Sequence, residues 1–291
     1  MNELSANDLP AVLHTIAEVR QWRAAAKERQ ERIGFVPTMG ALHEGHLSLV
    51  RASRGECDRT VVSIYVNPSQ FAPHEDFGRY PRTLESDLHQ LAGLADAVFV
   101  PNDAEIYPSG FATWVEPYGA AEPLEGEHRP GHFRGVATVV LKLFQIVGPD
   151  IAYFGQKDFQ QLRVIEQMRD DFHLPVEIRR CPIVREPDGL AMSSRNRYLS
   201  AEGRQKATAL FRSLEAARTA VAQGERAAAA IEAAVREVLL GVGGAEIDYV
   251  ALVDPVHLQP VERIAALTLC ALAVRIENTR LIDNTILEPP R

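Results

Sequence analysis

The first half of the chain alternates short apolar runs with longer segments of helical periodicity. Runs typical of strands lie at residues 33–37, 60–66, 97–100, 151–154 and 176–178. Helical spacing marks residues 43–53, 84–94, 136–146 and 160–170. Strands joined by helical crossovers predict an α/β fold with a parallel sheet that carries helices on both faces. In such a sheet ligands bind beyond the carboxyl ends of the strands, so candidate site residues should follow the apolar runs.

The pattern changes after about residue 184. Residues 200–241 are helical, with candidate turns at Gly203 and Gly224, and strand-like runs follow at 247–253, 268–276 and 279–287. Helices followed by strands predict a small C-terminal α+β domain. A length of 291 residues fits two domains of ordinary size, which we place at residues 1–184 and 185–291.

Composition limits the partners that this chain can have. The net charge of −8 argues against a sequence-independent grip on nucleic acid, which requires a basic face. The longest uncharged apolar run, at residues 264–274, is too short for a bilayer, which needs about 20 residues, so no membrane partner is expected. Three widely spaced cysteines and the lack of an apolar leader favour a location in a reducing cytoplasm.

The most informative motif, PTMGALHEGH, ends at His46 and lies where a predicted strand meets a helix. His43 and His46 are three residues apart, so at a helix start both imidazoles should point the same way. Gly40 and Gly45 allow close approach to the backbone, and a helix N-terminus binds phosphate, so we expect a polyphosphate site. Two alternatives are a pair of surface histidines and a zinc site. The zinc site is less favoured, because the spacing is not H-E-x-x-H and no third ligand is obvious.

A second motif, DGLAMSSRN, begins at Asp188. Ser193, Ser194 and Arg195 offer two hydroxyls and a guanidinium to a phosphoryl group in transfer. The structural alternative is a helix cap at Ser194 or Ser200. Together with the early H-x-x-H turn, this loop resembles the [KM]-S-S-[KR] loop of the nucleotidyl-transferring superfamily that includes class I aminoacyl-tRNA synthetases.

The motif FGQKDFQQ also follows a predicted strand. Gly155 allows close approach, and Lys157 can supply positive charge to a phosphate. A solvated lysine is the alternative, but the helix dipole disfavours a cation at this position, which argues for a ligand.

Neutral amides point to a carboxylate substrate. Gln70, in NPSQF, and Gln161 would hold a nucleophilic carboxylate without stabilising its charge as an arginine would. The glycine-rich loop before residue 136 adds Arg129 and His132, which either bind an anion or are simply solvated.

These blocks together resemble the pantothenate synthetase (pantoate–β-alanine ligase) family. The similar blocks are PTMGALHEGH, NPSQF, YPRT, RPGHFRGV, FGQKDFQQ, DGLAMSSRN and TRLIDN, which occur in this order between residues 35 and 284. Glu277 departs from the pattern, because a glycine is expected ahead of TRLIDN. In the YPRTLESDL segment either Glu85 or Asp87 could assist magnesium.

The resemblance implies a Rossmann-like ATP domain, a small C-terminal lid-like domain and a homodimer. It also implies a reaction in two steps. Pantoate and ATP give pantoyl adenylate and pyrophosphate, and β-alanine then attacks the adenylate to give pantothenate and AMP. Magnesium would neutralise the polyphosphate, held mostly by the nucleotide and water.

The same resemblance assigns residues to roles. His46 would assist the leaving pyrophosphate and Lys157 the α-phosphate, with His43 and Arg195 completing the catalytic set. The ATP-binding residues would be Met39, Gly40, Ala41, Leu42, His43, Glu44, Gly45, His46, Gly155, Gln156, Lys157, Asp158, Val184, Met192, Ser193, Ser194 and Arg195. The substrate-binding residues would be Gln70 and Gln161 for pantoate, Gln70 also for β-alanine, and Asn67, Tyr80, Arg129 and His132. The metal contact would be Asp87.

Three other functions were weighed against this one. An adenylyltransferase acting on a phosphate would need a cationic acceptor pocket, whereas Gln70 and Gln161 favour a carboxylate. A non-catalytic ATP-binding module is disfavoured because both histidines, Lys157 and both serines are present. A role on tRNA conflicts with the net charge of −8 and with the lack of a segment large enough to bind an anticodon.

Overall fold

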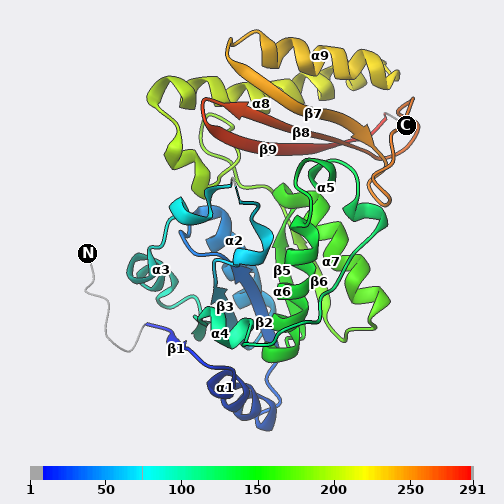
Figure 1. Cartoon of the computed structure of the whole chain (residues 1–291). Coiled ribbons are helices and arrows are strands. Elements are labelled where there is room, and N and C mark those ends of the chain that lie inside the picture. The colour runs from blue at the N-terminus through cyan, green and yellow to red at the C-terminus, as the bar shows by residue number, and fades with distance from the viewer. Residues whose placement is uncertain (1–8, 74, 290–291) are drawn as a thin grey trace. The chain divides into compact units, whose positions relative to one another are not determined.

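The computed structural model describes residues 9–73 and 75–289 (Figure 1). The chain forms two compact units, and each is described by itself. The first unit comprises Met1–Pro117, Arg129–Gln156 and Gln161–Pro182. The second comprises Tyr118–His128, Lys157–Gln160 and Ile183–Arg291. Two short segments that precede residue 184 therefore belong to the second unit, which a single boundary at residue 184 does not anticipate.

The first unit is built on a six-stranded parallel sheet in the order β1-β4-β3-β2-β5-β6. Its strands are β1 (Ala11–Leu13), β2 (Ile33–Thr38), β3 (Arg59–Ile64), β4 (Ala97–Phe99), β5 (Ile151–Gly155) and β6 (Glu177–Cys181). Its helices are α1 (Ile16–Glu28), α2 (Glu44–Glu56), α3 (Leu84–Leu91), α4 (Asp103–Ile106), α6 (His132–Val147) and most of α7 (Phe159–Asp171). Short 3₁₀ turns are η2 (Pro68–Gln70), η3 (Asp76–Arg79) and, shared between the units, η5 (Gln156–Asp158).

Alternate residues of the central strand β2 explain why both faces of this sheet are covered. Phe35 contacts Phe144 of α6, with ring centroids 6.4 Å apart. Its neighbour Val36 belongs to a buried cluster that includes Leu49 and Val50 of α2. Because successive strand side chains point to opposite faces, the continuous apolar run fills two helix–sheet layers. The predicted α/β fold is confirmed.

The second unit pairs two helices with a three-stranded antiparallel sheet in the order β7-β8-β9 (Figure 1). Its strands are β7 (Ala245–Val253), β8 (Thr268–Ile276) and β9 (Thr279–Leu287), and its longer helices are α8 (Ala201–Ala222) and α9 (Ala228–Leu240). Shorter elements are α5 (Glu125–His128), η4 (Gly119–Ala121) and η6 (Ser194–Tyr198). One buried cluster joins both helices to one face of the sheet. The predicted C-terminal α+β fold is confirmed.

Two expectations about local structure were incomplete or wrong. The strand β1 and the helix α1 were not predicted, although Thr15 and Glu18 form a capping box that signals the start of α1. The turn predicted at Gly203 is wrong, because this residue lies in the first turn of α8. A Cβ there would lie 2.5 Å from the carboxyl carbon of Glu277, so glycine leaves room for that side chain.

Glu277 occupies the β8–β9 turn with a φ of 54°, in the left-handed region that favours glycine. Its carboxylate accepts hydrogen bonds from the Ser200 hydroxyl and, at 3.1 Å, from the Ser200 backbone N–H. Glu277 thus stands where the family pattern has a glycine, and its side chain forms hydrogen bonds with Ser200, the residue that caps α8.

Two further observations concern the apolar and sulfur-bearing residues. In the described part of the chain, no helix combines the length and the apolar character needed to cross a membrane. Cys57, Cys181 and Cys270 are all buried free thiols.

Gly135 in α6 lets that helix approach the turn η2, which carries Gln70. A Cβ at this position would lie 2.4 Å from the Ser69 carbonyl oxygen, and backbone cannot move aside as a side chain can. We predict that Gly135→Ala lowers the free energy of unfolding by about 1–3 kcal/mol, although alanine is the better helix former. Urea denaturation measures the change. Gly55→Ala in α2 is the control, because its Cβ would meet nothing within 4 Å and should leave stability unchanged or higher.

Candidate functional site

The site residues in the first unit gather where β2 and β3 end. The loop after β2 places two consecutive residues in the left-handed region, Gly40 with a φ of 78° and Ala41 with a φ of 51°. The Thr38 hydroxyl accepts a hydrogen bond from the Gly40 N–H at 3.1 Å. A Cβ on Gly40 would lie 2.9 Å from Ile64, so the tight turn requires glycine for space as well as for conformation.

Asp87 binds the backbone of this loop. Its side chain is buried, and its two carboxylate oxygens accept the N–H groups of Ala41 and Leu42, each at 2.9 Å. The Thr83 hydroxyl donates a third hydrogen bond at 3.1 Å. The carboxylate therefore stabilises a backbone conformation that is costly for a residue other than glycine.

These contacts give the Asp87 carboxylate a structural role in the loop, with three of its hydrogen-bond positions occupied. Its magnesium role stays a prediction. Within residues 9–73 and 75–289, no three or more His, Cys, Asp or Glu side chains are grouped as a metal site would need. This removes support for the zinc alternative at the two histidines.

His43 and His46 lie side by side at the start of α2. His43 is the N-cap residue, and its Nδ1 accepts a hydrogen bond from the Gly45 N–H at 3.2 Å. The two ring centroids are 4.1 Å apart, as the spacing predicts. Two imidazoles beside the positive end of a 13-residue helix form a local environment that favours an anion. Glu44, between them, is exposed and forms an ion pair with Arg51.

Asn67 orients Gln70 and is itself fully enclosed. The Asn67 Nδ2 atom donates to the Gln70 Oε1 at 3.1 Å and to the Gly135 carbonyl at 3.2 Å. Its Oδ1 accepts from the hydroxyls of Ser69 and Tyr107, both at 2.9 Å. Asn67 is only 1% exposed. Asn67 thus orients the Gln70 amide, and its predicted substrate contact stays a prediction.

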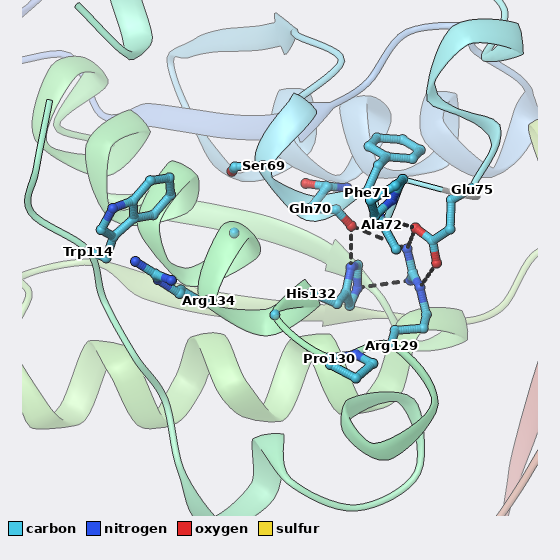
Figure 2. Close-up of a pocket in the computed structure, with 13 residues that line it drawn as sticks. Ser69, Gln70, Phe71, Ala72, Glu75, Trp114, Arg129, Pro130, His132 and Arg134 are labelled. Atoms are coloured by element: carbon cyan, nitrogen blue, oxygen red, sulfur yellow. Dashed lines mark hydrogen bonds and ion pairs between the residues drawn. The ribbon is translucent and has the colours of Figure 1, made fainter. Parts of the chain in front are cut away.

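Arg129 and His132 hold the other side of the same turn (Figure 2). Arg129 forms a two-bond ion pair with Glu75, Nε to Oε1 at 2.6 Å and Nη2 to Oε2 at 2.9 Å. The His132 Nδ1 lies 2.9 Å from the Gln70 carbonyl oxygen and its Nε2 lies 3.1 Å from Arg129 Nη1. Glu75 is not among the predicted site residues, because no local pattern links it to an arginine 54 residues away.

Gln70, Arg129 and His132 line one pocket of about 280 Å³ in the first unit. Figure 2 shows Trp114 and Arg134 at the other side of this pocket, where the Arg134 guanidinium lies 4.5 Å from the Trp114 ring. The neutral amide group of Gln70 and the ion-paired guanidinium of Arg129 suit a small polar ligand better than a bare phosphate.

The remaining first-unit residues lie at strand and helix ends. Tyr80 is buried, with its ring 6.0 Å from that of Phe71. Gly155 ends β5, Gln156 follows it, and half-buried Gln161 lies in the first turn of α7. A Cβ on Gly155 would meet nothing within 4 Å, so the structure leaves open space beside its backbone.

In the second unit, Lys157 follows β5 in the turn η5. Its side chain is 20% exposed and its Nζ lies 3.7 Å from the Asp158 carboxylate, a loose ion pair. Its backbone carbonyl accepts a hydrogen bond from Asn284 at 2.8 Å. The ammonium is thus partly shielded from water while its backbone is held in place.

A short hairpin leads to the serine-rich motif. The Met192 N–H donates to the Val184 carbonyl at 3.0 Å, and Arg185 pairs with Ala191. The Ser193 hydroxyl then accepts the Arg195 N–H at 3.3 Å and so caps η6, while Ser194 is buried. Ser200 caps α8. The cap suggested for Ser194 or Ser200 is therefore found at Ser200, and Ser193 also makes a cap contact.

Comparisons with known proteins agree with these motifs. The family described as Pantoate-beta-alanine ligase matches residues 11–286. The pantothenate synthetase of Moorella thermoacetica is 54% identical over 278 residues, 95% of this chain and 98% of that protein. The corresponding protein of Roseiflexus castenholzii is 55% identical over 277 residues, 95% of this chain and all of its own length.

Solved structures with the same fold are also similar. The crystal structure of pantothenate synthetase from Thermus thermophilus has a TM-score of 0.90 and 48% identity, covering 96% of this chain and 100% of that one. The pantoate-β-alanine ligase of Francisella tularensis, solved with β-γ ATP and β-alanine, has a TM-score of 0.79 and 36% identity over 95% and 97% of the two chains.

The ion pair of Glu75 gives a pH-dependent prediction. Burial alone would raise the pKa of Glu75, but the Arg129 guanidinium outweighs it and lowers the pKa from 4.5 to about 2. A carboxyl whose pKa is lower in the folded than in the unfolded protein stabilises the fold at pH values above its unfolded-state pKa. That stabilisation is lost as the pH falls towards the folded-state pKa. We predict that Glu75→Gln lowers the free energy of unfolding by about 1–3 kcal/mol at pH 7. The difference from the unsubstituted protein should shrink between pH 4.5 and about 2.

Denaturant titrations at a series of pH values measure this difference. Glu116→Gln is the matched control, because Glu116 pairs with Arg134 at an exposed site and should change stability by less than about 1 kcal/mol. A Glu75→Gln difference that stays constant from neutral to acid pH would contradict the prediction.

Proposed function

Since the chain belongs to the pantoate–β-alanine ligase family, we propose that it condenses pantoate with β-alanine through a pantoyl-adenylate intermediate. The observation that carries the proposal is the match of residues 11–286 to this family. The pantoate carboxylate attacks the α-phosphorus of ATP and pyrophosphate leaves. The β-alanine amine then attacks the acyl carbon, loses a proton and displaces AMP.

The geometry of the first unit supports specific roles in the first step. We assign His43 and His46 to the phosphates that leave as pyrophosphate, with His46 as proton donor or hydrogen-bond donor. The loop at residues 39–46 would present its two imidazoles and the positive end of α2 to the phosphates of ATP. Gln70, whose amide is oriented by Asn67, binds the carboxylate of pantoate and helps to place β-alanine, and Gln161 is the second amide.

The second unit supplies the groups that act on the α-phosphate. We assign Lys157 to the negative charge that develops there, and Ser193, Ser194 and Arg195 to the phosphate oxygens. We also assign nucleotide contacts to Asp158, Val184 and Met192 of this unit, and to Gly155 and Gln156 of the first unit. Adenylation needs no nucleophilic side chain, so its rate depends on positioning and electrostatics.

Magnesium enters this proposal as part of the MgATP substrate. Asp87 holds the loop, and the metal is bound mostly by the triphosphate and water. We also propose a homodimer, to be tested by sedimentation, and a cytoplasmic location, consistent with three buried thiols.

The rival function is an adenylyltransferase that transfers AMP to a phosphate instead of to the pantoate carboxylate. It would require a free cationic pocket, and both arginines that line the pocket with Gln70 form ion pairs, Arg129 with Glu75 and Arg134 with Glu116. The neutral amide of Gln70 therefore favours the carboxylate.

ATP–pyrophosphate exchange tests the function directly. We expect exchange that requires pantoate and magnesium, and AMP release with pantothenate once β-alanine is added. ATP binding without pantoate-dependent exchange would overturn the proposal.

Lys157→Ala should lower the rate of this exchange about 10²–10⁴-fold, because the transition state loses a partly desolvated cation. Lys27→Ala is the control, since Lys27 lies in the last turn of α1 and outside the proposed site. A Lys157→Ala variant with exchange close to that of the Lys27→Ala variant would remove Lys157 from the mechanism.

Asp87→Asn distinguishes loop positioning from metal binding. An amide cannot accept hydrogen bonds on both sides, so one loop N–H loses its partner, at a cost of about 1–3 kcal/mol. We predict lower stability and a KM for ATP raised about tenfold, with the magnesium requirement unchanged. Glu85→Gln is the control, because exposed Glu85 lies two residues before Asp87 in the same helix and its substitution should change neither quantity. A raised magnesium requirement in Asp87→Asn alone would favour the metal role.

A further inference from the structure

The motif TRLIDN has no part in the mechanism derived so far, yet it ends on two polar residues in the interior of the second unit. Asp283 and Asn284 are consecutive residues of β9 and are 2% and 3% exposed. Successive side chains of a strand point to opposite faces, so β9 directs one of them to each face of its sheet. Buried polar groups of this kind persist only with partners that satisfy them.

Asp283 holds the hairpin that leads to Ser193 and Arg195. Its carboxylate forms two bonds with Arg185, at 2.6 and 3.0 Å. Arg185 pairs with Ala191 across the hairpin and also donates to the Gly189 carbonyl at 3.0 Å. The position of residues 184–192 is therefore fixed to β9 by a bidentate ion pair whose carboxylate is buried.

Asn284 holds the backbone of the proposed catalytic lysine. Its Nδ2 donates to the Lys157 carbonyl oxygen at 2.8 Å, across 127 residues of sequence. The Asn284 backbone N–H donates to the Asp283 Oδ1 at 2.8 Å, which joins the Asp283 carboxylate to the backbone of Asn284. One strand thus connects the backbone of Lys157 with the hairpin that precedes the serine-rich motif.

We propose that Asp283 and Asn284 are positioning residues of the adenylation step. They fix Lys157 relative to the loop that carries Ser193, Ser194 and Arg195, so that these groups meet the same phosphates. The inference rests on the proposed function. Because a misplacement of about 1 Å can lower a rate about 100-fold, the loss of either contact should act on catalysis more than on ATP affinity.

Asn284→Asp tests the proposal in pantoate-dependent ATP–pyrophosphate exchange. The substitution keeps the shape of the side chain but replaces the donor that binds Lys157. We expect kcat to fall about 10- to 100-fold and the KM for ATP to change less than about threefold. Asn284→Ser, which introduces no charge, gives the same comparison if Asn284→Asp does not fold. Asp283→Asn should lower kcat in the same way.

Thr285→Val is the matched control. Thr285 is the next residue of β9, is 2% exposed, and its hydroxyl accepts a hydrogen bond from Arg218 at 2.8 Å. This contact leads to no proposed site residue. The control should keep kcat within about twofold of the unsubstituted enzyme even if its melting temperature falls.

A double-mutant cycle separates positioning from a general structural effect. If Asn284 acts through the Lys157 ammonium, Asn284→Asp should cause no further loss in a Lys157→Ala background. Independent losses that multiply, or a folded Asn284→Asp variant with unchanged kcat, would overturn the inference while the function stands. Absence of pantoate-dependent exchange in the unsubstituted enzyme would overturn the proposed function and this inference with it.

Discussion

The hydrogen bonds from Ala41 and Leu42 to the Asp87 carboxylate fix the turn on which the first-unit site depends. Two consecutive left-handed residues are unfavourable for a chain that includes an alanine, at a cost of about 1–3 kcal/mol. A buried, charge-assisted pair of hydrogen bonds offsets that cost. This turn at Gly40 and Ala41 also sets where α2 begins, and therefore where His43 and His46 lie.

The same principle recurs around Gln70 and Lys157. Neither residue is held mainly by its neighbours in sequence. Asn67 and His132 fix the turn that carries Gln70, and Asn284 fixes the carbonyl of Lys157. Each unit therefore supports its candidate site residues through hydrogen bonds to buried polar side chains. This favours electrostatic preorganisation, in which groups are held before charge develops.

Much of the fold was predicted from the local pattern of apolar residues in the sequence. The β-branched and apolar runs predicted the parallel strands because a strand covered on both faces must be apolar throughout. The runs at residues 268–276 and 279–287 coincide with β8 and β9. The edge strand β1 escaped detection because three residues carry too little periodicity, and Gly203 was misread as a turn because the reason for a glycine there, Glu277, lies in another element.

The sequence alone predicted the alternation of strands and helices after residue 33 and the chemical groups offered to a ligand. Imidazoles, a lysine, hydroxyls and neutral amides follow the strands or lie in loops, and their types and spacing are local properties. Tertiary structure decided what each polar residue contacts. Asp87 binds a loop 46 residues away, and Asn284 binds a carbonyl 127 residues away. Such hydrogen bonds form only when the chain has folded, so no periodicity or spacing in the sequence encodes them.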